Sequence, residues 1–207
     1  MPAVLLRHLS RLGLLLLSIG TSFSAVACPA GQAEVCMVSC ICVPGNQAEV
    51  DALYANVSQM AAAGLETWLV QSHSTAAAGA TQAMPLNIRA QLEPYYDLQV
   101  LDSARYKVGD DVQFNAAHTM LQNPDVNAVT LVDIIVFRNL DDAQNNVALW
   151  AHELKHVQQY QQWGVHEFAT RYTRDYKTVE APAYQMQSQV TRALKASANA
   201  SPAATAR

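Results

Sequence analysis

The segment His152-Glu153-Leu154-Lys155-His156 carries the residue types and the spacing of a metal-dependent hydrolase. Residues four apart share one face of a helix, so His152 and His156 can direct two imidazoles at one metal ion. Glu153 then lies beside the open coordination position, where a carboxylate acts as general base toward a zinc-bound water. The motif predicts zinc as cofactor, the two histidines as ligands and Glu153 as a catalytic residue.

The surrounding residues predict that this motif lies on a buried helix. Residues 146–162 contain neither Gly nor Pro and include a strongly apolar run, while Gly164 offers a C-cap. The candidates for the N-cap are Asp141, Asp142, Asn145 and Asn146. Burial keeps a histidine neutral and able to ligate. The alternative is a pair of core histidines with Glu153 facing solvent.

A zinc site of this kind needs a third protein ligand. Gln159 and Gln162 stand where a metzincin has Gly and His, so that class is excluded. Pro182 is tolerated only near the first turn of a helix, and this places Glu180 at the start of a second helix over residues 179–196. Glu180 is therefore the preferred ligand, although it could instead only favour the positive end of the helix dipole. The other candidates are His166, Glu167 and Asp175.

Further motifs extend on both sides of this segment. They include residues 84–89, 100–108 and 151–160, followed by Gly164, Phe168, Arg171-Tyr172 and Glu180-Ala181-Pro182-Ala183-Tyr184. In these motifs the chain resembles the metallopeptidase domain found beside extracellular contractile injection systems, over about residues 84–190. The resemblance implies a gluzincin-like arrangement in which His152, His156 and Glu180 are the ligands and Glu153 is the base. It identifies no substrate.

Peptide hydrolysis at such a site also uses a donor to the tetrahedral oxyanion. Tyr172 is the first choice as this catalytic residue, because the pair Arg171-Tyr172 is shared with the family that the chain resembles. The other candidates are His166, Tyr176 and Tyr184. The alternative for each of them is a packing or surface role.

The N-terminal residues have the pattern of a secretory signal peptide. Arg7 and Arg11 precede a short apolar core, and Ala25-Val26-Ala27 is an A-x-A cleavage site. We therefore expect residues 1–27 to be removed and the protein to be periplasmic or secreted. Cleavage would leave Cys28 first, which raises a lipid anchor as an alternative. Ala25 stands where lipoprotein signals usually carry Leu, so a soluble exported protein is the preferred interpretation.

Composition limits the partners. Cleavage at residue 27 removes two arginines and no acidic residue, so the formal charge changes from −4 to −6. An acidic chain argues against nucleic acid and anionic lipid, and no further apolar run is long enough to span a bilayer. We expect a peptide or protein substrate and, as an alternative partner, the cell envelope or secretion machinery.

All four cysteines lie near the N-terminus, at positions 28, 36, 40 and 42. In an oxidising compartment, two disulfides that staple a small loop are the natural interpretation, and four cysteines allow three pairings. A second zinc site is the alternative, but the spacing fits no common zinc module. If Cys28 were lipidated, one of the other three would be left over.

The remaining pattern predicts an α+β fold, a small zincin-like domain with helices packed on a short sheet. We expect a cysteine-rich segment at 28–47, the metallopeptidase domain at 48–195 and a disordered tail at 196–207. Within the domain, the pattern predicts helices at 48–71 and 85–92, a mobile loop at 72–83, extended chain at 98–108 and turns at 109–111 and 125–127. Residues 128–138 form the best strand, either the upper edge of a substrate cleft or an ordinary buried strand.

Three functions fit these observations. The first is an exported zinc metalloendopeptidase. The second is a non-catalytic, zinc-stabilised binding or assembly module, and the third is an envelope structural protein in which the motif is incidental. The intact Glu153 favours the first, because a structural site needs no base beside an open coordination position.

Overall fold

The computed structural model describes residues 28–36, 40–121 and 127–200. The chain divides into two compact units between Val50 and Asp51. The signal peptide and cleavage site expected at 1–27, and the turn expected at 125–127 except for its last residue, lie outside the described residues.

The smaller unit is a disulfide-stapled hairpin. Strands β1 (Gln32–Cys36) and β2 (Cys40–Pro44) pair antiparallel, and Cys28 is bonded to Cys42. The side chain of Gln47 adds two hydrogen bonds to the backbone of Glu34. One of the two expected disulfides is therefore present, while the side chains of Cys36 and Cys40 lie outside the described residues.

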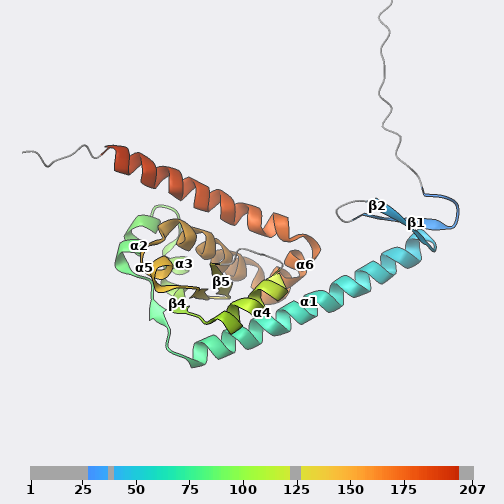
Figure 1. Ribbon diagram of the computed structural model, residues 1–207, viewed down its shortest axis with the longest axis horizontal. Helices are drawn as coiled ribbons and strands as arrows, with labels where there is room; N and C mark the ends of the chain where they lie inside the picture. Colours follow the sequence, from blue (N-terminus) through green and yellow to red (C-terminus); the bar gives the residue numbers. More distant parts are fainter. Residues whose placement is uncertain (1–27, 37–39, 122–126, 201–207) are drawn as a thin grey trace, which may run out of the picture. The chain divides into compact units, whose positions relative to one another are not determined.

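The larger unit has an α+β fold in which long helices pack on a small mixed sheet (Figure 1). The strand order is β3 (Gln82–Ala83), β4 (Arg105–Val108), β6 (Ile134–Phe137) and β5 (Ala128–Leu131). Strands β4 and β6 run parallel, and the other neighbours run antiparallel. Strand β5 is thus an edge strand of this sheet.

Both faces of the sheet are covered, which explains the continuous apolar run in β5 and β6. Ile135 and Phe137 pack into one core with Trp150 and Leu154 of α6 (Val147–Ala200). Alternate residues, such as Val129 and Val136, pack into a second core, which contains residues of α1 (Gln47–Ala78) and α4 (Asp111–Leu121). Because side chains alternate across a strand, the position of Thr130 assigns its side chain to the face covered by α6.

The predicted strand at 128–138 is two strands. A hairpin joins β5 to β6 through Val132, whose φ of 63° lies in the left-handed region that β-branched residues rarely adopt. The turn consists of Val132 and Asp133, without the Gly or Asn that normally marks one, and a single polar residue interrupts the apolar pattern. The prediction of a single strand was wrong for that reason.

Two other local predictions were wrong. Helix α1 continues to Ala78, through most of the loop predicted at 72–83. Alanine favours helix, and the hydroxyls of Ser74 and Thr75 bond back to carbonyls four residues earlier instead of breaking the helix. The extended chain predicted at 98–108 is confirmed only in β4, whereas its first part is a helix, α3 (Leu98–Ser103).

Short helices precede the helix that carries the motif. The predicted helix at 85–92 is present as α2 (Leu86–Leu92), and the acidic, Asn-rich stretch forms α5 (Leu140–Asn145). The amide oxygen of Asn146 then accepts from the backbone N–H of Leu149 at 3.0 Å, which caps the start of α6 as the sequence predicts.

Helix α6 contains two breaks, at Gly164 and at Asp175. Gly164 has a φ of 75°, which suits glycine, and it ends the motif-bearing segment where a C-cap was expected. After Asp175 the chain is helical again through Glu180 and Pro182 to Ala200, so residues 196–200 are helical rather than disordered, and 201–207 lie outside the described residues.

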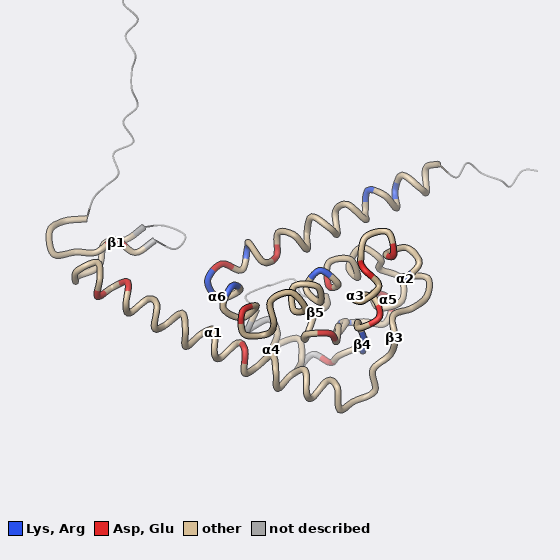
Figure 2. The backbone as a smooth tube through the Cα atoms, turned by 180° about the vertical axis from the view of Figure 1, so that it is seen from behind, with Lys and Arg blue, Asp and Glu red and all other residues tan. Residues whose placement is uncertain are grey.

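Charge is unevenly distributed over the long helices. Helix α1 carries acidic and no basic side chains, whereas most charges of α6 beyond Asp175 are basic (Figure 2). None of the described helices combines the length and the apolar character needed to cross a membrane.

Candidate metal centre

His152, His156 and Glu180 converge on one point in the larger unit. The Nε2 atoms of the two histidines lie 3.1 Å apart. Oε2 of Glu180 lies 3.2 Å from Nε2 of His152 and 3.5 Å from Nε2 of His156. All three side chains are buried, and the structure thus brings together the three residues that the sequence nominates as ligands.

The spacing of these atoms fits a metal ion. A tetrahedral ion with bonds of about 2.0–2.1 Å separates neighbouring donor atoms by about 3.3 Å, close to the three distances observed here. Oε2 of Glu180 is buried and has no hydrogen-bond partner. An unpaired buried carboxylate oxygen is costly unless something positive meets it. Two imidazoles and a carboxylate are also the donor set of many catalytic zinc sites.

The other oxygen of Glu180, Oε1, is fixed by a hydrogen bond. The hydroxyl of Tyr172 donates to Oε1 at 3.0 Å and also lies 2.8 Å from the carbonyl oxygen of Leu121. Burial and then the Glu180 carboxylate raise the pKa of Tyr172, so the phenol stays protonated and remains a donor. Oε2 is left for the histidines.

The charge state of Glu180 follows from two opposing influences. Burial, the larger single influence, raises the pKa of this carboxyl, but its contacts with His152 and His156 together lower it below the ordinary value. The carboxyl is therefore ionised at neutral pH, as a metal ligand must be.

Glu153 lies beside the triad and is fixed by the sheet. Its carboxylate accepts a hydrogen bond of 2.7 Å from the hydroxyl of Thr130 on β5, and both side chains are buried. The same hydroxyl lies 3.2 Å from the backbone carbonyl of Glu153. Because Thr130 is on the face of β5 that α6 covers, the sheet orients the carboxylate predicted to be the base.

The remaining candidates lie outside the triad. His166 pairs with Glu66 at 2.8 Å, Glu167 pairs with Arg171 at 2.7 Å, and Asp175 is exposed at the second break of α6. Tyr172 contacts a ligand directly, as described above. Another histidine of the larger unit, His73, is partly exposed and pairs with Asp133 at 2.7 Å.

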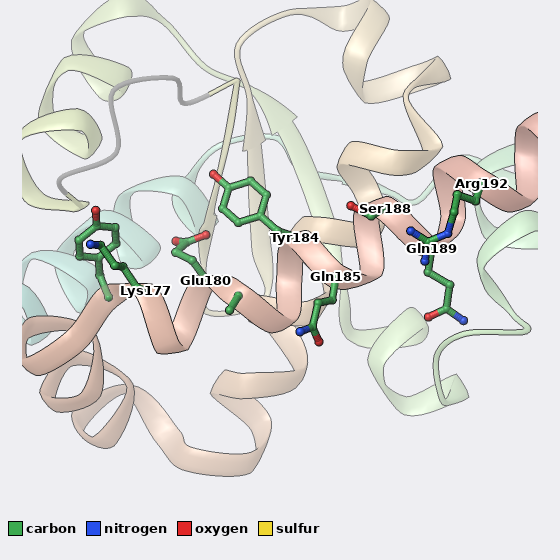
Figure 3. A pocket seen from close by; sticks show the side chains of 9 residues that line it. Lys177, Glu180, Tyr184, Gln185, Ser188, Gln189 and Arg192 are labelled. Carbon is green, nitrogen blue, oxygen red and sulfur yellow. The ribbon is translucent and has the colours of Figure 1, made fainter. Parts of the chain in front are cut away.

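Tyr184 borders the site from the surface. Its ring meets that of His152 at a centroid distance of 4.6 Å, and about half of the side chain is exposed. Figure 3 shows the Glu180 carboxylate and the Tyr184 ring on the same side of α6. Tyr184 and Glu180 also line an open hollow that continues along α6 to Arg192.

The cavity at the triad itself is small, about 30 Å³, and is lined by residues from β5, α6 and the end of α4. This space is sufficient for an ion or a water molecule.

Sequence reasoning missed two residues that hold the site. Thr130 stands in an apolar strand, where a lone polar residue at a position facing the motif helix was the available signal. Gln159 entered only as an argument against a metzincin, yet it is buried and hydrogen-bonded to His156. A glutamine three residues after a ligating histidine lies on the same helix face, which was its signal.

Comparison with known proteins gives one match. The chain matched no curated protein and no solved structure. Residues 83–164 match a family model described as the eCIS core domain. This segment lies within the region of the resemblance noted in the sequence, contains His152, Glu153 and His156, and ends before Glu180.

Proposed function

We propose that this protein is an exported zinc metallopeptidase that hydrolyses peptide bonds with Glu153 as general base. The observation that carries the proposal is the buried triad, in which one Glu180 oxygen faces both histidines, beside a second buried carboxylate. A structural zinc site is normally closed by four protein ligands, whereas three ligands and a nearby base are the pattern of a hydrolytic one.

The residues would share the chemistry as follows. His152, His156 and Glu180 hold the ion, which when bound supplies Lewis acidity toward the scissile carbonyl and acidifies water. Glu153 accepts the proton of the attacking water and passes it to the leaving amine. Thr130 keeps the Glu153 carboxylate in place through the 2.7 Å hydrogen bond.

The oxyanion donor has two candidates at different places. Tyr172 was the first choice from the sequence, and its hydroxyl is engaged with Glu180 and Leu121. Tyr184 lies at the rim of the triad and is half exposed, where a substrate carbonyl could reach it. If Tyr172 acts only through Glu180, Tyr172→Phe will weaken zinc binding, while Tyr184→Phe will lower kcat without changing zinc content.

Export is part of the same proposal. It rests on residues 1–27, and the disulfide between Cys28 and Cys42 supports it, because disulfides persist in oxidising compartments. The disulfide also favours the soluble form, since a lipidated Cys28 thiol could not join it. N-terminal sequencing of the exported protein tests both points: we expect it to begin at an unmodified Cys28.

A second candidate function is favoured by one observation. The cavity at the triad is small, about 30 Å³, and the hydroxyl of Tyr160 lies 3.5 Å from the Thr130 carbonyl at the edge strand, where a peptide would pair. A non-catalytic, zinc-stabilised binding or assembly module of the cell envelope or a secretion system would need no larger site.

The two functions separate in one experiment. Wild type and Glu153→Gln are loaded with zinc and assayed on unfolded casein and on a quenched peptide library. The peptidase proposal expects a loss of roughly 10²–10⁴-fold in hydrolysis with unchanged zinc content. Equal activity in both proteins would reject the general base. Absence of hydrolysis in wild type, together with unfolding on zinc removal, would support the binding module instead.

A further inference from the structure

We propose that Gln159 is a positioning residue that fixes the ligating form of His156 and ties it to the segment carrying Glu180. The inference rests on the metal site of the proposed function, but not on catalysis. Gln159 is buried with 2% of its surface exposed. Its Oε1 lies 2.8 Å from Nδ1 of His156, and its Nε2 donates to the carbonyl of Val179 at 2.8 Å.

The two ends of the amide cannot be exchanged. The carbonyl of Val179 can only accept, so the NH₂ group of Gln159 must face it. Oε1 then faces His156 and can only accept, so Nδ1 of His156 carries the hydrogen. The lone pair of a neutral His156 is thereby left on Nε2, the atom that points at Glu180 and His152. One amide thus selects the tautomer that can bind a metal.

The same amide bridges two parts of the chain that are not rigidly connected along the backbone. His156 and Glu180 are separated by the breaks at Gly164 and Asp175, so helical geometry alone does not set their distance. Val179 immediately precedes Glu180. A hydrogen bond to its carbonyl therefore fixes the backbone next to the third ligand.

His152 provides an internal contrast. Its Nδ1 is buried and has no hydrogen-bond partner, and its ring contacts that of Tyr184 instead. Gln159 selects the tautomer of His156 through Nδ1, whereas Nδ1 of His152 has no such partner. This difference predicts that the orientation and tautomer of the His156 ring in metal-free protein depend on Gln159.

The test uses zinc itself as the probe. Gln159→Met keeps the length of the side chain and removes both hydrogen bonds. Gln159→Glu keeps an acceptor for His156 but cannot donate to Val179. Gln161→Met is the matched control, because Gln161 lies two residues away and bonds to Ser103 on the surface. Zinc affinity is measured by competition with a chromophoric chelator.

We expect zinc to bind roughly 10–100-fold more weakly to Gln159→Met, the usual effect of losing a partner of a ligating histidine. Gln159→Glu should lie between Met and wild type, and the Gln161 control should match wild type. Affinity of Gln159→Met within about threefold of wild type would overturn the inference.

A second readout covers the case in which Gln159→Met does not fold. In metal-free wild type, at a pH where both rings are neutral, ¹⁵N spectra should show His156 with hydrogen on Nδ1, whereas His152, whose Nε2 faces Oε2 of Glu180, should carry hydrogen on Nε2. A neutral His156 with hydrogen on Nε2 and none on Nδ1 would overturn the inference in wild type alone. These outcomes are separate from the peptidase test: full activity in Glu153→Gln rejects catalysis but not the role of Gln159, whereas wild type that binds no zinc rejects both.

Discussion

Histidine meets a carboxylate at three places in the described part of the larger unit, and the three differ in kind. On the surface, His166 lies 2.8 Å from Glu66, and the partly exposed His73 lies 2.7 Å from Asp133. Each of these is one ring with one oxygen at hydrogen-bond distance. In the buried triad, two rings face one oxygen of Glu180 at 3.2 and 3.5 Å, and that oxygen has no hydrogen bond.

The difference shows what separates an ion pair from a ligand set. A single ring can donate its hydrogen directly to a single carboxylate oxygen, so such a pair needs no third group. In the triad, the three donor atoms are buried and are separated by about the distance expected between neighbouring ligands of one tetrahedral ion. Such a set needs a cation to be complete. The surface pairs serve as natural controls for every test of the triad.

The largest expected difference lies in metal content. His156→Ala should abolish the binding of one zinc per chain, because two remaining ligands do not hold the ion in competition with a chelator. His166→Ala removes a histidine from a complete pair and should retain full zinc. Metal analysis of proteins purified without added zinc measures both. Equal zinc content in the two variants would contradict the assignment of His156, and not His166, as a ligand.

A second difference concerns the carboxylates. Glu180→Gln retains size but loses the negative charge, so we expect zinc to bind at least about 100-fold more weakly, as for loss of a direct ligand contact. Glu66→Gln makes the same change in a surface pair and should leave affinity unaltered. Chelator competition is the measurement, and a Glu180→Gln protein with wild-type affinity would move the third ligand elsewhere.

Zinc should also stabilise the fold through the triad alone. A ligand at 100 times its Kd stabilises the native state by about 2.7 kcal/mol when it binds only that state. We therefore expect the Tm of wild type to fall on chelation and that of His156→Ala to stay constant. Thermal scans with and without chelator give the answer. A Tm in wild type that is independent of zinc would mean that the folded protein does not bind it.

The smallest effect belongs to the surface pair. The hydrogen bond that His166 donates to the Glu66 carboxylate, and then the charge of that carboxylate, raise the pKa of His166 above its ordinary value. The stabilising contribution of the pair is therefore complete below the ordinary histidine pKa of about 6.5 and is lost as pH rises through the raised value. In Glu66→Gln the pKa should return toward the ordinary value, which NMR titration follows. An unchanged pKa would show that the pair does not form in solution.

The chemistry of the site could be nominated from the sequence because it is local. His152, Glu153 and His156 lie within one helical turn and a half, so periodicity alone places them together. Glu180 was reached by a longer argument that placed it with Pro182 at the start of a helix. That start was wrong, because the helix resumes after Asp175 and contains Pro182, but the Glu180 carboxylate does lie against both histidines. The metal itself, and catalysis, remain predictions.

The parts that the sequence did not predict depend on contacts between distant segments. The turn at Val132 is set by pairing of β5 with β6, against the preference of a β-branched residue. The extension of α1 to Ala78 depends partly on packing, since Leu69 and Ala76 are buried in the core that α1 and α4 form with the sheet. The apolar residues that suggested the helix at 48–71, such as Leu53 and Met60, are instead exposed. Thr130 was missed for the same reason, since its partner Glu153 is 23 residues away, and so was the bond from Gln159 to Val179, 20 residues away.

The account is tested most directly by the zinc coordination shell of the exported chain, measured by X-ray absorption. We predict one zinc per chain with histidine nitrogen and carboxylate or water oxygen neighbours at about 2.0–2.1 Å, two imidazoles among them, and the loss of this signal in His156→Ala. Zinc surrounded by sulfur at about 2.3 Å would place the metal among the N-terminal cysteines, and no zinc would leave the triad without its ion. Either result would contradict the proposed metal centre.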